Sequence, residues 1–412
     1  YPLINPYDKK IVGYLNAREV FNTIVAGAWK NGEPGMIFLD QINRDNHVIE
    51  QFGEMVATNP CGEQPLLGNE SCNLGSINLA KFYIENDSED WLDKINWHRL
   101  EKVTRTSTRF LDNVIDANYY ATQDIEDMTK ATRKIGLGVM GFADLLIQLK
   151  TPYSTELART IGGKVIQSIR EWSDDESLRL GVIRGTFPAW DKSTYKITEA
   201  YRNHCRLTVA PTGTISMIAD TSSGIEPTFA LVWKKQNILD GKTLNYMNKY
   251  FESDARKYGF YSEELMDYLA VGGSLQTTEV PDWVKQVYAT APEISPEDHV
   301  LMQASFQEQV DSGISKTINF ANSATIEDIE NAYILAWKTG CKGITVYRAG
   351  SRAKEVLVKG NVETDTYIDY VSDDSQVFSM ISEEACCENP FVVMESGCET
   401  CKSCGWSACL IA

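Results

Sequence analysis

The sequence lacks the features of a membrane protein, a secreted protein or a duplex-binding protein. Its 412 residues contain no run of eighteen apolar residues, so no membrane span is expected. Basic residues number 39 against 57 acidic ones, and a net charge of −18 argues against binding to nucleic acid. The chain starts at Tyr1 with neither an initiator Met nor the pattern of a signal peptide. We therefore expect a fragment of a cytoplasmic protein.

Histidine is scarce, whereas cysteine is plentiful. The four histidines are His47, His98, His204 and His299. Because no two of them have the spacing of metal ligands, we expect them to be structural. Of the ten cysteines, six lie between Cys386 and Cys409. In a chain this long, such clustering indicates redox or metal chemistry rather than a small disulfide-stapled domain.

Length and hydrophobic patterning predict an α/β protein with a separate tail. Helices are expected over residues 17–30, 91–115, 135–149 and 329–337, and strands over residues 36–39, 205–210 and 343–347. We place the main domain at residues 1–352. An acidic stretch without periodicity predicts a flexible linker at residues 353–385, and a cysteine-rich tail follows at residues 386–412.

The loop at residues 58–76 carries an amide, a thiol and a carboxylate at alternate positions, Asn59, Cys61 and Glu63. Alternate residues of an extended loop point to one side, so these three groups could converge on one small ligand. A second thiol, Cys72, lies eleven residues beyond Cys61. The alternative is a Pro- and Gly-rich turn around a structural cysteine, because free cysteine often behaves as a small apolar residue.

Two glycine-containing segments suggest nucleotide chemistry. The first, residues 211–215, follows an expected strand and opens an expected helix, where backbone N–H groups can bind phosphate; an ordinary turn is the alternative. The second, Gly136-x-Gly138-x-x-Gly141, matches the dinucleotide fingerprint by letter. We reject that match because no convincing strand precedes it, and we attribute its glycines to close helix packing.

Five segments together resemble the ribonucleotide reductases, in the form that depends on adenosylcobalamin. They occur in the family's order, within a resemblance that covers roughly residues 1–352: PGMIFLDQINRDN (34–46), NPCGEQPLLGNESCNLGS (59–76), RKIGLGVMGFADLL (133–146), APTGTISMIADTSSGIEP (210–227) and GCKGITVYRAGSR (340–352). The resemblance implies a ten-stranded α/β barrel with a central finger loop at residues 58–76. It also implies that this chain is the C-terminal part of the catalytic polypeptide.

The resemblance further implies roles for individual residues. Cys61 matches the thiyl-radical cysteine, Glu63 the base at the ribose 3′-OH, and Asn59 the amide that orients the substrate hydroxyls. Cys72 matches half of the electron-donating cysteine pair, whose other half is expected before Tyr1. The residues implied to bind substrate are Asn59, Pro60, Cys61, Gly62 and Glu63 in the finger loop, and Pro211, Thr212, Gly213, Thr214 and Ile215 at the diphosphate.

The class of reductase follows from two absences. The subunit-dependent class passes its radical through an adjacent tyrosine pair, whereas residues 346–350 contain Tyr347 alone. The glycyl-radical class has a glycine motif near its C-terminus, where this chain has cysteines. Both absences favour adenosylcobalamin as the radical source, with reduction of ribonucleoside diphosphates as the activity. The alternative is the large subunit of a class I enzyme, whose radical arises in a separate metal-containing subunit.

The tail cysteines permit two kinds of chemistry. Cys404 and Cys409 resemble the family's mobile dithiol, which would reduce the active site and then meet thioredoxin or a similar reductant. Cys398 and Cys401, with Cys386 or Cys387, could instead bind zinc. Both roles remain open, as does a homodimer. A zinc-binding module on a catalytically inactive scaffold is the alternative from outside the enzymes.

Overall fold

The computed structural model describes residues 1–238 and 242–351, together with the backbone of three strands in the tail. Side chains are described for residues 1–232 and 247–351. The chain divides into two units, Tyr1–Asn361 and Val362–Ala412. In the described part of the chain, no helix is both long and apolar enough to cross a membrane.

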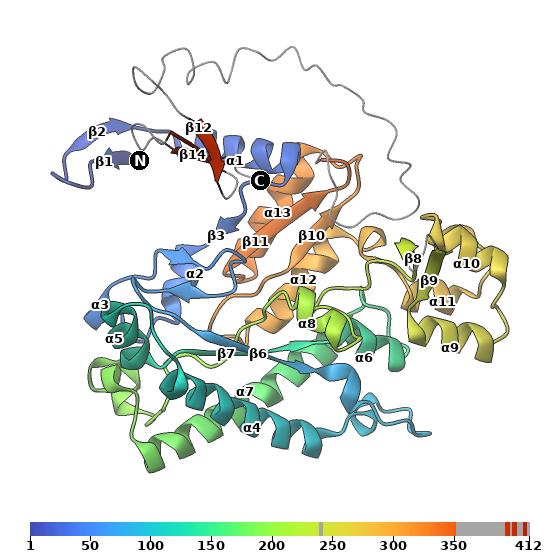
Figure 1. Ribbon diagram of the computed structural model, residues 1–412, viewed down its shortest axis with the longest axis horizontal. Helices are drawn as coiled ribbons and strands as arrows, with labels where there is room; N and C mark the ends of the chain where they lie inside the picture. The colour runs from blue at the N-terminus through green and yellow to red at the C-terminus, as the bar shows by residue number, and fades with distance from the viewer. Residues whose placement is uncertain (239–241, 352–391, 396–397, 402–406, 410–412) are drawn as a thin grey trace. The chain divides into compact units, whose positions relative to one another are not determined.

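The first unit contains helices and short strands in mixed order (Figure 1). Its strands are β1 (Pro2–Ile4), β2 (Ile11–Tyr14), β3 (Met36–Ile37), β4 (Ala57–Thr58), β5 (Pro65–Leu66), β6 (Asn73–Asn78), β7 (Ile135–Met140), β8 (Val232–Ile238), β9 (Lys242–Met247), β10 (Thr317–Phe320) and β11 (Gly343–Arg348). Its helices are α1 (Ala17–Asn31), α2 (Leu39–Arg44), α3 (Ile49–Phe52), α4 (Trp97–Ala117), α5 (Gln123–Thr132), α6 (Phe142–Gln148), α7 (Glu156–Arg184), α8 (Gly213–Ile218), α9 (Lys249–Lys257), α10 (Glu263–Ala270), α11 (Asp282–Val287), α12 (Pro296–Gln307) and α13 (Ile326–Lys338). The tail contributes β12 (Val392–Glu395), β13 (Cys398–Cys401) and β14 (Ser407–Cys409), which pair antiparallel.

Parallel pairing joins the central strands into one array. β6 pairs with β7, and β10 pairs with β11, both in parallel. Single parallel bridges, Leu137 to Leu207 and Val209 to Ile314, connect these two pairs through the segment at residues 207–209. β3 closes the other side of β11 in antiparallel orientation. The array therefore follows the order β6, β7, residues 207–209, residues 314–320, β11 and β3.

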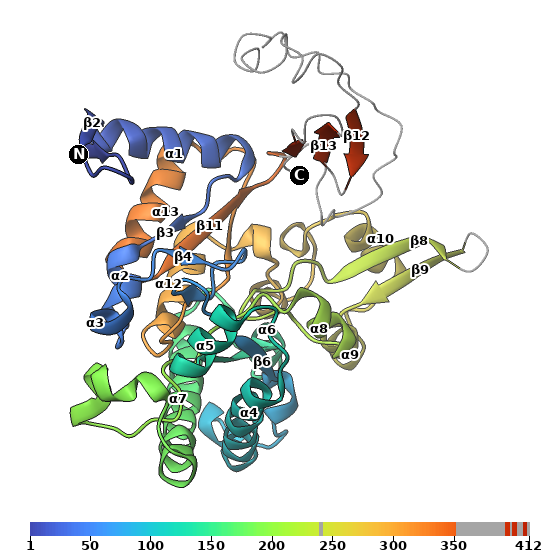
Figure 2. The same cartoon turned by 60° about the vertical axis from the view of Figure 1, so that its left-hand side comes forward.

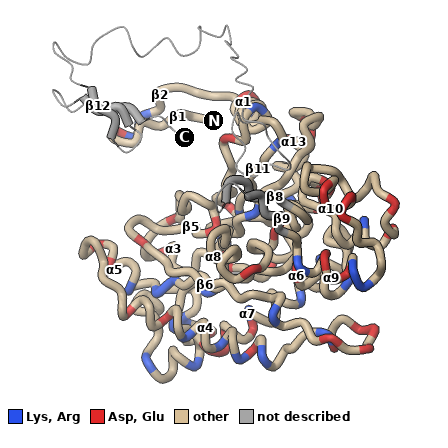
Figure 3. The backbone as a smooth tube through the Cα atoms, turned by 45° about the vertical axis from the view of Figure 1, so that its right-hand side comes forward, with Lys and Arg blue, Asp and Glu red and all other residues tan. Residues whose placement is uncertain are grey.

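Helices cover the outer face of this array, as parallel strands require. α4 packs against α7 and against both β6 and β7, and α12 packs against α7 and β10. The main core lies between these layers and includes Ile77, Leu111, Leu137, Val165 and Phe306. Figure 3 shows charged residues along α4 and α7, whereas the sequences of β6, β7 and β10 contain none.

Besides a small core that includes Ile42 and Phe187, the unit has two further cores. One joins α1 and α13 to β11, through Val25, Ala28, Tyr333 and Val346 among others. The other lies among α9, α10 and α11, beside the β8–β9 hairpin (Figure 2). All of these helices except α11 start at side-chain caps, such as Thr325 for α13 and Ser262 for α10.

Several expected elements are confirmed with small changes of boundary. The helix expected at 17–30 is α1, the one at 329–337 lies within α13, and the strand at 343–347 is β11. The helix expected at 91–115 divides into a 3₁₀ turn and α4, because the Asn96 side chain caps a new helix by accepting from Arg99 N–H. The strand expected at 36–39 is shorter, since Leu39 opens α2. Residues 205–210 pair only through single bridges.

The helix predicted over residues 135–149 is wrong in its first half. Residues 135–140 form β7, a fully buried strand, and α6 starts only after Gly141. A short apolar run has the same appearance in a buried strand and a buried helix, so periodicity could not separate them. The expectation that the glycines permit close helix packing is also wrong. Gly136 and Gly138 instead permit a close approach of neighbouring segments. A Cβ on Gly138 would lie 2.3 Å from Thr208 O, and one on Gly136 would lie 2.6 Å from Gln64 Nε2.

Candidate active site

Strands β4 and β5 form the base of the finger loop, which we call its neck. β4 and β5 pair antiparallel, with Thr58 opposite Pro65. Between them the chain turns sharply: Gly62 N–H donates to Asn59 O at 3.1 Å, and Gly62 has φ of +80°. The alternating extended loop expected from the sequence is therefore wrong at this point, because residues 59–62 form a turn.

The turn orients Asn59 through its own backbone. Gln64 N–H donates to Asn59 Oδ1 at 3.0 Å, and Asn59 N–H donates to Gln64 O at 3.1 Å. The loop uses one of the two lone pairs of the Asn59 side-chain oxygen, and the amide nitrogen can donate to another molecule. Asn59 is thus presented as a donor.

Two residues from distant segments anchor the tip of the loop. Glu63 O accepts hydrogen bonds from Gly313 N–H and from Thr208 Oγ1, both at 2.8 Å. A Cβ on Gly313 would lie 2.6 Å from Gly62 O, so only glycine permits this approach. The loop is held against the strand array, next to the bridge between Val209 and Ile314.

Cys61 and Glu63 differ in exposure but act on each other electrostatically. Cys61 is exposed, whereas Glu63 is 2% exposed. Glu63 Oε2 is buried and has no hydrogen-bond partner among the described residues. Burial raises the pKa of the Cys61 thiol, and the negative charge of Glu63 raises it further. Cys61 is therefore protonated at neutral pH, as a donor of a hydrogen atom must be.

Cys72 lies directly before β6 and is half-buried. Burial above all raises its pKa to about 12; the charges of Glu70 and Glu63 add to this, while Lys134 opposes it. Because Glu63 influences both thiols, Cys61, Glu63 and Cys72 belong to one electrostatic environment. In the described part of the chain both cysteines are free thiols.

The turn at Pro211–Ile215 has the geometry of a helix N-terminus with open donors. Thr212 precedes α8 in the left-handed region, at φ +57°, and makes no side-chain cap. Its hydroxyl instead accepts from Gly224 N–H at 2.8 Å, which holds this unusual conformation. Gly213, Thr214 and Ile215 are exposed and form the first turn of α8, where backbone N–H groups lack partners within the helix and can bind an anion.

The predicted tail residues are described only as backbone or not at all. Cys398 and Cys401 lie on β13, and Cys409 lies on β14 opposite Cys398. Cys404 falls outside the described residues, as do Cys386 and Cys387. Among the residues that the structure describes, no group of His, Cys, Asp and Glu could hold a metal ion.

A cavity of about 950 Å³ lies away from these residues. It is lined in part by Arg44, His47, Arg159 and Arg170, and by none of the predicted site residues. Its arginines are already paired; Arg159 binds Asp298, for example. We therefore place the candidate active site at the finger loop and not in this cavity.

Sequence reasoning missed four residues that build the site: Thr208, Gly313, Glu70 and Lys134. Thr208, Glu70 and Lys134 lie within or beside segments already singled out, but nothing in their spacing shows which groups they meet. Thr208 and Gly313 reach the loop only because the strand array brings residues 207–209 and 313 beside it. Long-range pairing of this kind leaves no local signal.

The structure thus defines an α/β protein in which a thiol-bearing loop is anchored against a helix-covered array of mostly parallel strands. This chain belongs to the ribonucleotide reductase family, since the profile described as "Ribonucleotide reductase, barrel domain" matches residues 5–201 and 197–347. The family resemblance of the sequence motifs is thereby confirmed.

Among curated proteins, the chain is 50% identical over 363 residues to the vitamin B12-dependent ribonucleoside-diphosphate reductase of Thermoplasma acidophilum, covering 88% of this chain and 46% of that protein. It is 43% identical over 356 residues to the enzyme of that name from Mycobacterium tuberculosis, covering 86% and 50%. The chain thus spans about half the length of the curated relatives it matches.

A solved structure, the class Id ribonucleotide reductase alpha subunit of Actinobacillus ureae, is similar to this chain with a TM-score of 0.67. The match covers 81% of this chain and 61% of that one at 24% identity. At this identity the likeness supports the fold alone.

Proposed function

We propose that this chain is the catalytic part of a vitamin B12-dependent ribonucleoside-diphosphate reductase. The observation that carries the proposal is the placement of Asn59, Cys61 and Glu63 on one anchored turn, in the electrostatic environment of Cys72. Relatives with 43% and 50% identity that carry this name support the cofactor assignment. They favour it over the class I alternative.

Each finger-loop group has a role that suits its surroundings. When bound, adenosylcobalamin supplies the radical that oxidises Cys61, whose exposed and protonated thiol fits a hydrogen-atom donor. The resulting thiyl takes the 3′-hydrogen of the ribose. Glu63 accepts the 3′-OH proton, and Asn59 donates from its free amide nitrogen to a substrate hydroxyl. Water then leaves C2′.

Two electrons from a pair of cysteines complete the reduction. Cys72 and a partner cysteine are oxidised to a disulfide as the ribonucleotide becomes a deoxyribonucleotide and water. Cys61 recovers its hydrogen atom at the end of the cycle. The backbone N–H groups of the exposed residues Gly213, Thr214 and Ile215, within the segment Pro211–Ile215, hold the substrate diphosphate, whose negative charge suits a helix N-terminus.

The proposal extends to the whole architecture. The parallel array is part of a ten-stranded barrel at residues 1–352, followed by an acidic linker at 353–385 and the redox tail at 386–412. Cys404 and Cys409 re-reduce the active site and receive electrons from thioredoxin or a similar dithiol. Cys398 and Cys401 are candidate zinc ligands, and the enzyme is a homodimer.

A direct test mixes the full-length protein with adenosylcobalamin, a ribonucleoside diphosphate and a dithiol. We expect a cobalt(II) paramagnetic signal to form rapidly and deoxyribonucleotide to accumulate. Product formation that needs a separate metal-containing subunit, without a cobalt signal, would instead support the class I alternative. Absence of both product and signal would refute the proposal.

The anchoring glycine provides a second test. In Gly313→Ala, the new methyl group collides with Gly62 O and displaces the finger-loop tip. Because a shift of about 1 Å in a reacting group costs on the order of 100-fold in rate, we expect turnover to fall by that order while the protein stays folded. Gly68→Ala is the matched control, since a Cβ there meets nothing within 4 Å. Equal turnover of the two variants would contradict the anchoring role.

A further inference from the structure

A fully buried ion pair lies beside Cys72. Lys134 Nζ and Glu70 Oε2 are 2.7 Å apart, and both side chains are 0% exposed. Glu70 Oε2 also accepts Leu67 N–H at 3.0 Å, whereas its other oxygen is buried without a partner among the described residues. Burying two charges costs about as much as their attraction returns, so stability alone gives little reason for such a pair.

The ammonium group of Lys134 also holds the neck of the finger loop. It donates to Pro65 O at 2.7 Å, and its third neighbour is Met55 Sδ at 3.9 Å. Pro65 starts β5, the strand by which the loop that carries Cys61 returns to the fold. One side chain from the start of β7 therefore contacts the loop neck and the Glu70 turn together.

The strand register brings the backbones of Cys72 and Lys134 close together. Asn73 pairs with Ile135 at the start of the parallel β6–β7 ladder. Cys72 and Lys134 directly precede this pair on the two strands. The electrostatics agree with this placement: Lys134 opposes the rise in the pKa of Cys72, while Glu70 adds to it. The pKa of Lys134 is itself raised, because Glu70 and the nearby thiols outweigh the effect of burial.

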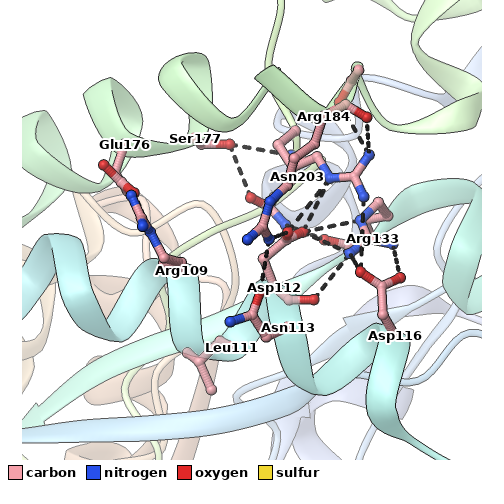
Figure 4. A network of polar contacts seen from close by, with 12 residues as sticks. Arg109, Leu111, Asp112, Asn113, Asp116, Arg133, Glu176, Ser177, Arg184 and Asn203 are labelled. Atoms are coloured by element: carbon pink, nitrogen blue, oxygen red, sulfur yellow. Dashed lines mark hydrogen bonds and ion pairs between the residues drawn. The ribbon is translucent and has the colours of Figure 1, made fainter. Parts of the chain in front are cut away.

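Arg133, the residue before Lys134, is held in place by its own set of contacts. Arg133 adopts a left-handed conformation at φ +47° and donates to Asp112 Oδ1 at 2.8 Å and to Asp116 Oδ1 at 2.7 Å (Figure 4). Asn203 Nδ2 donates to Arg133 O at 3.0 Å. With Arg133 held on one side of the turn, Lys134 is directed to the other side, toward Glu70 and the loop neck.

We propose that Lys134 is a positioning residue for electron delivery: its ammonium stabilises the thiolate that Cys72 becomes when its disulfide is reduced, and Glu70 holds that ammonium in place. This inference rests on the proposed function. An incoming dithiol, as thiolate, attacks the partner sulfur; a new S–S bond forms, the old one breaks, and Cys72 leaves with the electron pair. The second thiolate of the dithiol then resolves the mixed disulfide, and both released sulfurs take up protons.

The charge of Lys134 can be isolated with two variants of the full-length protein. Glu70→Gln removes the carboxylate charge and keeps an acceptor for the ammonium, whereas Glu70→Gln/Lys134→Met removes both charges. The measurement is the rate at which iodoacetamide alkylates Cys72 in the reduced protein near neutral pH, followed by mass spectrometry of its peptide. Glu63 and Cys205, whose charges also raise the pKa of Cys72, are unchanged in both variants.

We expect Cys72 to react on the order of ten-fold faster in Glu70→Gln than in the double variant, because a neighbouring cation favours the thiolate. Glu70→Gln should also exceed the wild type. Equal rates in the two variants would overturn the proposal, since a purely structural pair has no reason to change thiol reactivity. If the double variant does not fold, a Glu70→Gln rate no higher than that of the wild type would overturn it as well.

Turnover measurements distinguish a failure of this inference from a failure of the proposed function on which it rests. Protein reduced beforehand and mixed with substrate gives a single burst of product, whereas continuous turnover needs re-reduction by dithiol. In the double variant we expect the continuous rate to fall more than the burst does. Equal losses would refute a role in electron delivery. A wild-type protein without any burst would refute the proposed function itself, while the alkylation rates would still report on Lys134.

Discussion

Cys61→Ser is expected to leave the protein folded and to reduce its deoxyribonucleotide production to the background of the assay. An O–H bond is much stronger than an S–H bond, so a serine cannot supply the hydrogen atom or take it back. The exposed position of Cys61 on a turn anchored by other groups means that the change removes no packing. Product formation and thermal unfolding, measured on the same preparation, test the two halves of this expectation.

A matched control removes a thiol elsewhere. Cys341 is buried next to Thr339 and outside the finger loop, so Cys341→Ser is expected to keep turnover near the wild-type value. If Cys61→Ser retained deoxyribonucleotide production, the radical role would be wrong. A wild-type protein that makes no deoxyribonucleotide would instead fit the alternative of a binding module on a catalytically inactive scaffold.

Asp112→Asn is expected to destabilise the protein by about 3–5 kcal/mol, the range for removing one partner of a buried ion pair. The Asp112 carboxylate is fully buried and accepts hydrogen bonds from Arg133, Arg184 and Asn203 (Figure 4). Its loss leaves the buried Arg133 with one carboxylate partner, the half-exposed Asp116. Denaturant unfolding of both proteins measures the difference.

The control for this variant is an exposed ion pair. Asp8 and Lys10 lie 3.5 Å apart with both side chains largely exposed, so Asp8→Asn should cost less than about 1 kcal/mol. A small effect of Asp112→Asn, similar to that of Asp8→Asn, would show that the arginines find other partners. The turn that directs Lys134 would then not depend on Asp112.

The buried charges at the start of β7 connect the helix layer to the finger loop. Arg133 and Lys134 are consecutive, yet each is satisfied by a different carboxylate on a different element, Asp112 on α4 and Glu70 in the loop before β6. A single turn thus ties the outer helix layer to the neck of the finger loop. Fold stability and site geometry share these contacts.

The sequence alone determined the family and predicted the chemistry-bearing residues of the finger loop. Its motifs are contiguous, so their recognition needs no knowledge of which segments meet in space. Apolar periodicity also located α1, α13 and β11, because each presents one regular face to the core. Charge and the lack of long apolar runs argued against duplex binding and a membrane span before any element was placed.

Tertiary structure decided how the finger-loop groups are held. Residues 135–140 form a strand and not a helix only because β6 and residues 207–209 supply partners on both sides. Likewise, Gly313 and Thr208 became anchors, and Lys134 a neighbour of Cys72, only when distant segments packed together. Hydrogen bonds and buried charges depend on distances of a few ångströms between residues far apart in the chain. Local patterns contain no information about those distances.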